Sequence, residues 1–226
     1  IPTCPDSIIT KGLNKNQKVE LYQFNPISMK HFLLLFAVCF LCCNNSEVET
    51  LPVKDYNSFH KEAKEFCKEN GYNESYYFLV DLSLHSGKNR FFIYDFTLKK
   101  VLDKNLVTHG SCDQFEENPD KWKKVKFDHR IDSHCSMKGK YKIGNRDYSS
   151  WGINVKYWLH GLEATNKSAE KRVVVLHSWS AVKNKEVYPR HSPLSWGCLA
   201  VSDAFMEKLD VRLQQSEKPV LLWIVE

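Results

Sequence analysis

Two residues that can carry out nucleophilic catalysis together stand in the second half of this 226-residue chain. His177 ends the apolar run 173–177, and Cys198 follows 21 positions later in the segment Ser195-Trp-Gly-Cys. A cysteine attacks an amide carbonyl as the thiolate, so it needs a nearby base such as an imidazole to take its proton. The pair therefore predicts Cys198 as a nucleophile and His177 as its base.

Such a reaction also needs donors that hold the developing oxyanion. Glycine lets the backbone bend sharply, so Gly197 can turn N–H groups around Cys198 toward that charge. The candidates for oxyanion or substrate binding are Ser195, Trp196, Gly197, Ser178 and His109. Trp196 stands out among the tryptophans because it lies inside the Cys198 segment, whereas buried aromatic side chains usually belong to the core.

Three alternatives compete with this interpretation. His191 lies seven positions before Cys198 in a polar turn and is a second candidate base, although a solvated histidine is the ordinary expectation there. A zinc site could use His109, Cys112, His134 and Cys135, but the adjacent pair 134–135 departs from common zinc-ligand spacing. A lone buried cysteine is usually only a small apolar side chain. If Cys198 is of that kind, the protein would be a binding module without catalytic activity.

Composition excludes other classes of function. The net charge is only +5, and the chain has no basic arm, RNA-binding signature or Gly-rich phosphate loop. We therefore expect no nucleic-acid partner, and the Cys–His chemistry needs no cofactor.

The N-terminal part resembles a targeting region. Residues 29–43 combine an early lysine, about ten apolar residues and a final Cys43, as a signal peptide or a lipoprotein signal does. Residues 1–28 are interpreted as upstream sequence, and 44–74 as a tether and short helix. The apolar run is too short for a membrane-spanning helix, which needs roughly 20 apolar residues. From the signal we expect the mature protein in the cell envelope, periplasmic or on the outer face, with or without a lipid anchor.

Apolar periodicity predicts a mostly β domain with a few helices over residues 75–226. Runs rich in aromatic and β-branched residues predict strands at 76–82, 90–96, 101–108, 141–143, 157–162, 172–177 and 220–225. Helical spacing predicts helices at 55–70, ended by Gly71, and at 202–215, capped by Ser202 or Asp203.

Residues 111–139 show no periodicity, and a loop of this length is usually functional or mobile. In an oxidising compartment we expect Cys112 and Cys135 to pair, because both lie in this loop-rich stretch while Cys198 lies in a separate segment.

Taken together, the His177-Ser178 pair and the Ser195-x-Gly-Cys198 segment resemble the signature of the L,D-transpeptidase (YkuD-like) domain. The resemblance is to the branch of murein L,D-transpeptidase catalytic domain proteins, and spans roughly 76–201. Three further segments fall in the same order: 107–110, 140–144 and 159–162.

The resemblance implies a β-sandwich or barrel in which Cys198 attacks the third residue of a peptidoglycan stem tetrapeptide and releases D-alanine. Transfer of the acyl group to an amine would form a 3-3 cross-link, and transfer to water would make the protein an L,D-carboxypeptidase. An inactive or zinc-containing wall-binding module is the other alternative. The chain departs from the broader family at Trp196 and Ala200, where that family often has His and Arg, and at Leu199, where the nearer branch commonly has Pro.

Overall fold

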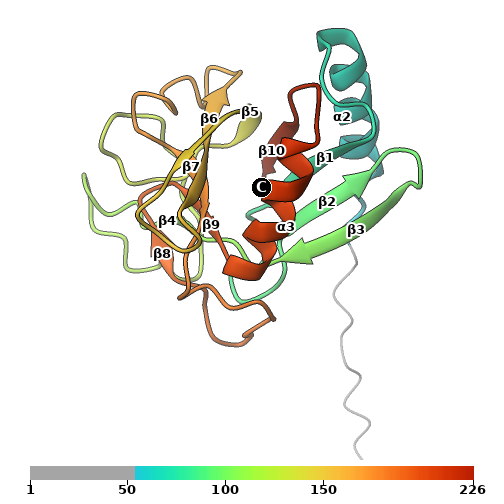
Figure 1. Cartoon of the computed structure of the whole chain (residues 1–226). Coiled ribbons are helices and arrows are strands. Elements are labelled where there is room, and N and C mark those ends of the chain that lie inside the picture. Colours follow the sequence, from blue (N-terminus) through green and yellow to red (C-terminus); the bar gives the residue numbers. More distant parts are fainter. Residues whose placement is uncertain (1–53) are drawn as a thin grey trace, which may run out of the picture. The chain divides into compact units, whose positions relative to one another are not determined.

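Ten strands and two helices make up residues 54–226, the part of the chain that this computed structural model describes (Figure 1). The predicted fold class, mostly β with a few helices, is confirmed. The interpretations of residues 1–28, 29–43 and the tether up to 53 lie outside the described residues. Within 54–226, neither helix is long and apolar enough to cross a membrane.

Eight strands form one mixed sheet in the order β3-β2-β1-β10-β5-β6-β7-β9. Their bounds are β1 (Tyr76–Asp81), β2 (Phe91–Asp95), β3 (Lys100–Asn105), β5 (Gly139–Tyr148), β6 (Val155–Gly161), β7 (Val175–Ser178), β9 (Leu199–Val201) and β10 (Leu221–Val225). The pairs β1–β10 and β7–β9 are parallel, and the other neighbours are antiparallel. Two short strands, β4 (His109–Gly110) and β8 (Leu194–Ser195), pair in parallel as a separate sheet.

The central strands are buried on both faces, because each face is covered by one helix (Figure 1). On β1, Phe78 and Val80 enter the main core, whereas Tyr77 and Leu79 enter a second, aromatic-rich core. The two alternating sets explain why these strands read as continuous apolar runs in the sequence.

Helix α2 (Asn57–Asn70) covers the second core through Ala63 and Cys67 and ends at Gly71. Gly71 has φ +72°, the left-handed conformation in which glycine commonly follows a helix. Helix α3 (Asp203–Gln214) covers the main core and begins at Ser202, whose hydroxyl accepts a hydrogen bond from the Phe205 N–H. Both predicted helices and their end signals are confirmed.

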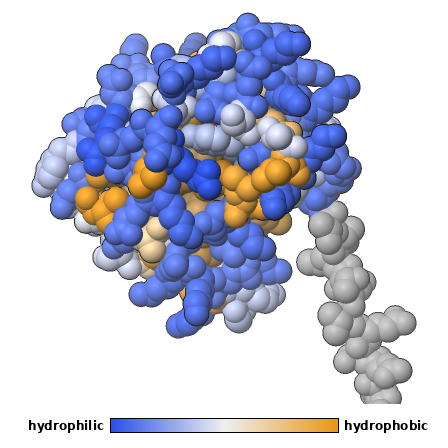
Figure 2. Space-filling model, turned by 45° about the vertical axis from the view of Figure 1, so that its right-hand side comes forward, coloured by the Kyte–Doolittle hydropathy of each residue, from blue (hydrophilic) through white to orange (hydrophobic). Residues whose placement is uncertain are grey.

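The strand predicted at 172–177 is wrong at its start, because β7 begins only at Val175. Val173 has φ +55°, a left-handed conformation that is rare for a β-branched residue and cannot continue a strand. The strand predicted at 101–108 similarly ends at Asn105. The face shown in Figure 2 is mainly hydrophilic, with apolar residues in limited areas between the polar ones.

Candidate active site

The base candidate His177 lies on β7, a strand whose four residues are all buried. Its Nδ1 lies 2.9 Å from the Ser178 carbonyl oxygen. A carbonyl only accepts hydrogen bonds, so Nδ1 carries the proton and Nε2 keeps its lone pair. Burial is the main cause that lowers the pKa of His177, so the ring is neutral near pH 7 and Nε2 can take a proton.

Ser178, which holds His177, is itself fixed by a neighbouring turn. Its hydroxyl accepts a hydrogen bond of 2.9 Å from the Ile153 N–H. Gly152 packs directly against it with φ +55°, and a Cβ atom there would lie 2.6 Å from the Ser178 carbonyl oxygen. Glycine at 152 therefore lets the chain reach the carbonyl that orients the base.

The nucleophile candidate Cys198 immediately precedes β9. The register pairs Leu176 with Leu199 and His177 with Ala200. Leu176 and Leu199 point into the main core, so His177 and Ala200 point to the opposite face. Cys198 immediately precedes this pair of strands, so the chain brings it to the edge of the strand that carries His177.

The thiol of Cys198 is held by the first residues before β7. Its Sγ donates a hydrogen bond of 3.6 Å to the carbonyl oxygen of Val173. Burial raises the pKa of the Cys198 thiol, while a backbone hydrogen bond from Val175 and the charges of Arg172 and Lys156 lower it in part. With the pKa of the thiol raised and the pKa of the imidazole lowered, the two groups rest as neutral thiol and neutral imidazole in the free protein.

Two hydroxyl groups fix the backbone of the nucleophile. The Cys198 carbonyl accepts hydrogen bonds from Ser195 Oγ at 2.8 Å and Thr108 Oγ1 at 3.0 Å. Ser195 Oγ also accepts the Gly197 N–H at 3.1 Å, and Thr108 Oγ1 accepts the Ala200 N–H at 2.9 Å. These hydroxyls hold the turn that presents the thiol.

Gly197 allows an arginine and a distant carbonyl to approach this turn. It has φ +107°, and a Cβ atom would lie 2.6 Å from the Cys135 carbonyl oxygen and 3.0 Å from Arg172 Nη2. Arg172 donates to the carbonyls of Cys135 (2.8 Å) and Trp196 (3.3 Å) through Nη2, and to Asp128 (2.9 Å) through Nη1. One guanidinium therefore ties the loop 111–139 to the nucleophile turn.

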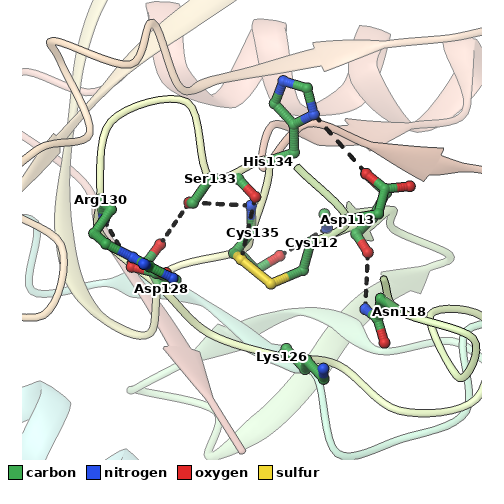
Figure 3. Close-up of a disulfide and its surroundings, with 12 residues drawn as sticks. Cys112, Asp113, Asn118, Lys126, Asp128, Arg130, Ser133, His134 and Cys135 are labelled. Atoms are coloured by element: carbon green, nitrogen blue, oxygen red, sulfur yellow. Dashed lines mark hydrogen bonds and ion pairs between the residues drawn. A yellow bond between two sulfur atoms is a disulfide. The ribbon is translucent and has the colours of Figure 1, made fainter. Parts of the chain in front are cut away.

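The predicted disulfide Cys112–Cys135 is confirmed and anchors this loop (Figure 3). It places His134 beside the nucleophile turn, where the imidazole stacks on Trp196 with centroids 4.4 Å apart and planes within 1°. His134 Nδ1 in turn lies 3.9 Å from the carboxylate of Asp113 (Figure 3). The Trp196 side chain is 71% exposed, so this stacked pair offers an aromatic surface to solvent.

The family model described as the L,D-transpeptidase catalytic domain matches residues 51–222. The chain belongs to this family. Enzymes of the L,D-transpeptidase family act on peptidoglycan, and both His177 and Cys198 lie within the matched residues. The match includes both residues, the loop 111–139 and Arg172.

Solved structures, two of them L,D-transpeptidases, also resemble the chain at low identity. A domain from Xylanimonas cellulosilytica (residues 123–326 of that protein) is 12% identical, with TM-score 0.38, over 71% of this chain and 68% of that chain. L,D-transpeptidase 3 from Mycobacterium tuberculosis, in complex with a faropenem-derived adduct, is 9% identical, with TM-score 0.36, over 67% of this chain and 60% of that one. The helical cell shape determining protein Pgp2 from Campylobacter jejuni is 14% identical, with TM-score 0.36, over 71% of this chain and 54% of that one. A search of curated proteins gives no match.

Two of the predicted histidines lie in other surroundings. His109 is buried, and its ring lies between Arg90 Nη2 (2.8 Å from Nδ1) and the Lys121 carbonyl (2.8 Å from Nε2). Both ring nitrogens thus have protein partners, and His109 meets the nucleophile segment through the pairing of β4 with β8. His191 contacts the Ser86 hydroxyl at 3.2 Å and packs on the His85 ring.

The alternative zinc site is wrong in this structure, because Cys112 and Cys135 are bonded to each other and cannot serve as thiolate ligands. Its His109 also has both ring nitrogens occupied by protein partners. The described residues contain no cluster of three or more His, Cys, Asp or Glu side chains suited to a metal ion.

The sequence analysis missed Gly152, Arg172 and Thr108 as parts of the site. Thr108 stands next to His109, and Arg172 immediately precedes the apolar run that ends in His177. Both positions are sequence neighbours of candidates, but only the folded chain shows that their side chains meet the Cys198 turn. Gly152 gives no such signal, because it lies 25 residues before His177.

Proposed function

We propose that this domain is a cysteine-dependent L,D-transpeptidase that forms 3-3 cross-links between peptidoglycan stem peptides. The observation that carries the proposal is the tautomer of His177, whose Nδ1–H is committed to Ser178 and whose Nε2 is left as a base. The position of Cys198 directly before β9, the strand that pairs with β7, and membership of the family support it.

In the acylation step, His177 Nε2 takes the proton of the Cys198 thiol as the sulfur attacks the carbonyl carbon of the third stem residue. The C–S bond forms, and the carbonyl π electrons move onto oxygen. Collapse of this intermediate breaks the C–N bond, and His177 returns the proton to the leaving amine of D-alanine. Because both groups start neutral, the attack depends on transfer of the thiol proton to His177.

In the second step, an amine from a neighbouring stem peptide attacks the thioester. His177 takes the amine proton, the new amide forms, and the C–S bond breaks to restore the thiol. If water replaces the amine, the same residues release a tripeptide, which is L,D-carboxypeptidase activity. The two outcomes share every protein group and differ only in the acceptor.

For the oxyanion we assign the backbone N–H of Cys198, for which no hydrogen bond is found within residues 54–226. The Gly197 N–H donates to Ser195 Oγ, so Gly197 and Ser195 shape the turn that aims this donor. We assign the exposed Trp196, stacked on His134, to contact with substrate.

We further propose that the protein works in the cell envelope on stem peptides. The disulfide Cys112–Cys135 supports this location, because such bonds persist in oxidising compartments. The signal or lipoprotein signal at 29–43 remains a prediction.

The test is incubation of the purified domain with isolated sacculi, followed by muropeptide analysis. The proposal expects new 3-3 cross-linked dimers and free D-alanine from the wild type, and neither product from Cys198→Ala. Tripeptides without dimers would establish the carboxypeptidase instead. Unchanged muropeptides, with equal wall binding by both proteins, would contradict enzymatic activity and favour a binding module.

A further inference from the structure

Arg172 is a cation without an acidic partner beside the nucleophile turn. It is partly buried and forms no salt bridge within residues 54–226. The charges of Asp128 and Asp132, on the loop that it contacts, act on Arg172, but neither forms a salt bridge with it, and Asp128 is paired with Arg130 at 2.6 Å. A partly buried charge of this kind normally has an opposite charge beside it.

The guanidinium is nevertheless held rigidly. Three carbonyl groups accept its hydrogen bonds, from Asp128, Cys135 and Trp196. Arginine has five N–H donors, so two of them remain without a protein partner in the described part of the chain. The side chain is thus fixed in place while keeping donors and its full charge for a ligand.

Its place next to the thiol suggests what that ligand is. Arg172 Nη2 contacts the Trp196 carbonyl and would lie 3.0 Å from a Cβ atom at Gly197, the residue before Cys198. The charge of Arg172 is also among the causes that lower the pKa of the Cys198 thiol against the effect of burial. A substrate anion bound by Arg172 would lie close to the reacting carbonyl.

The other cation near the thiol is already engaged. Lys156 pairs with Asp147 at 3.4 Å and lies over the Trp158 ring. Arg172 has neither a salt bridge nor an aromatic ring of this kind within residues 54–226. It is therefore the better candidate for binding an anion from outside the protein.

We propose that Arg172 binds the free carboxylate of the residue that leaves when Cys198 is acylated, and so restricts cleavage to the last peptide bond of the donor. The inference rests on the proposed function. Only three bonds separate the attacked carbonyl carbon from the carboxylate carbon of a terminal residue, which is a span of about 4 Å. In a donor longer by one residue this position holds a neutral amide, which forms a weaker hydrogen bond to arginine than a carboxylate does.

The test compares two synthetic stem tetrapeptides, one with a C-terminal carboxylate and one with a C-terminal amide, by release of D-alanine or D-alanine amide. Wild type is expected to prefer the acid roughly 10- to 100-fold in kcat/KM, the range of a hydrogen bond to a charged group. Arg172→Gln should bring the ratio close to 1 by losing activity on the acid. Arg172→Lys should keep part of the preference, and the matched control Arg212→Gln on α3 should keep all of it.

The ratio separates binding of the carboxylate from a structural role. If Arg172 only holds the nucleophile turn, Arg172→Gln slows both donors equally and keeps the wild-type ratio, which would overturn the inference. A wild type that cleaves both donors equally would overturn it while leaving the proposed function intact. Cleavage of neither donor by the wild type would remove the proposed function and this inference with it.

Discussion

The strand that carries His177 and the turn that carries Cys198 are held by different kinds of interaction. His177 sits in the ladder of β7, buried, with its ring oriented by the carbonyl of the next residue. Cys198 lies outside the strands and depends on hydroxyls from Ser195 and Thr108, and on the carbonyl contacts of Arg172 to its turn. The base is therefore oriented by its own strand and the next residue, whereas the turn of the nucleophile is also tied to the distant residues Thr108 and Arg172.

The difference also appears in the backbone. The nucleophile side of the site consists of the turn 195–198, the loop 111–139 and residues 172–173. Four of its non-glycine residues have positive φ angles: Cys112, Asp132, His134 and Val173. Such conformations persist only where the surrounding structure fixes them, and here the disulfide, Arg172 and the Cys198 thiol all engage that region. We infer that the nucleophile side is the more sensitive of the two to loss of a single support.

The largest effect is expected on the base side. His177→Ala should slow acylation of Cys198 by about 10²- to 10⁴-fold, because the thiol starts neutral and loses the base assigned to take its proton. The measurement is the rate of covalent adduct formation with a carbapenem, followed by intact mass. His191→Ala is the matched control and should change the rate little, since that ring contacts Ser86 and His85. If His191→Ala were strongly impaired and His177→Ala nearly normal, the assignment of His177 as the base would be wrong.

The second-largest effect is expected from a change that affects the nucleophile side alone. Replacing both Cys112 and Cys135 by serine opens a loop of sequence separation 23 and should lower the free energy of unfolding by about 3 kcal/mol, measured in urea. Acylation should also slow, because the disulfide holds in place the backbone carbonyl of residue 135 that fixes Arg172. The nitrogen resonances of His177 should keep the Nδ1–H tautomer. Loss of that tautomer would show that the two sides are not independent, and unchanged stability and rate would remove the disulfide from the account.

The smallest effect concerns pH. The pKa of His177 is lowered by burial below its usual 6.5, so the base form is present at pH 6.5 and above and is lost only as the pH falls further. The pKa of the Cys198 thiol is raised above 9.0, so direct ionisation adds rate only in alkaline solution. The carbapenem acylation rate should therefore be nearly flat between about pH 7 and 8.5. A bell-shaped optimum within that range would contradict both shifts, because it would place the two pKa values inside the range.

The sequence predicted the regular parts of the molecule and the two reacting residues. Apolar periodicity located both helices, and the spacing of His177 and Cys198 pointed to one site, because these signals are local. The predicted strand boundaries were wrong where tertiary contacts overrode the apolar pattern of the sequence. The run 172–177 is apolar enough for a strand throughout, yet Arg172 turns to three carbonyls and Val173 takes a positive φ.

The nucleophile side was the least predictable. The two-residue strands β4 and β8 are too short to show any period, and the loop 111–139 is organised by a disulfide and carbonyl contacts that leave no pattern in its sequence. Strand β5 was predicted only at 141–143, since its second half is polar and mostly exposed. Sequence reasoning thus predicted the two candidate residues and missed the parts of the chain that hold the Cys198 turn.

The most direct test of the central claim is the site of carbapenem acylation, read by intact mass and peptide mapping. The account predicts one adduct on Cys198 in the wild type, none in a folded Cys198→Ala, and a normal adduct in Cys67→Ala. That variant removes the other free cysteine of residues 54–226, which is buried on α2 with its pKa raised to about 12. A wild type that forms no adduct, or an adduct that persists in Cys198→Ala, would contradict the assignment of Cys198 as the nucleophile.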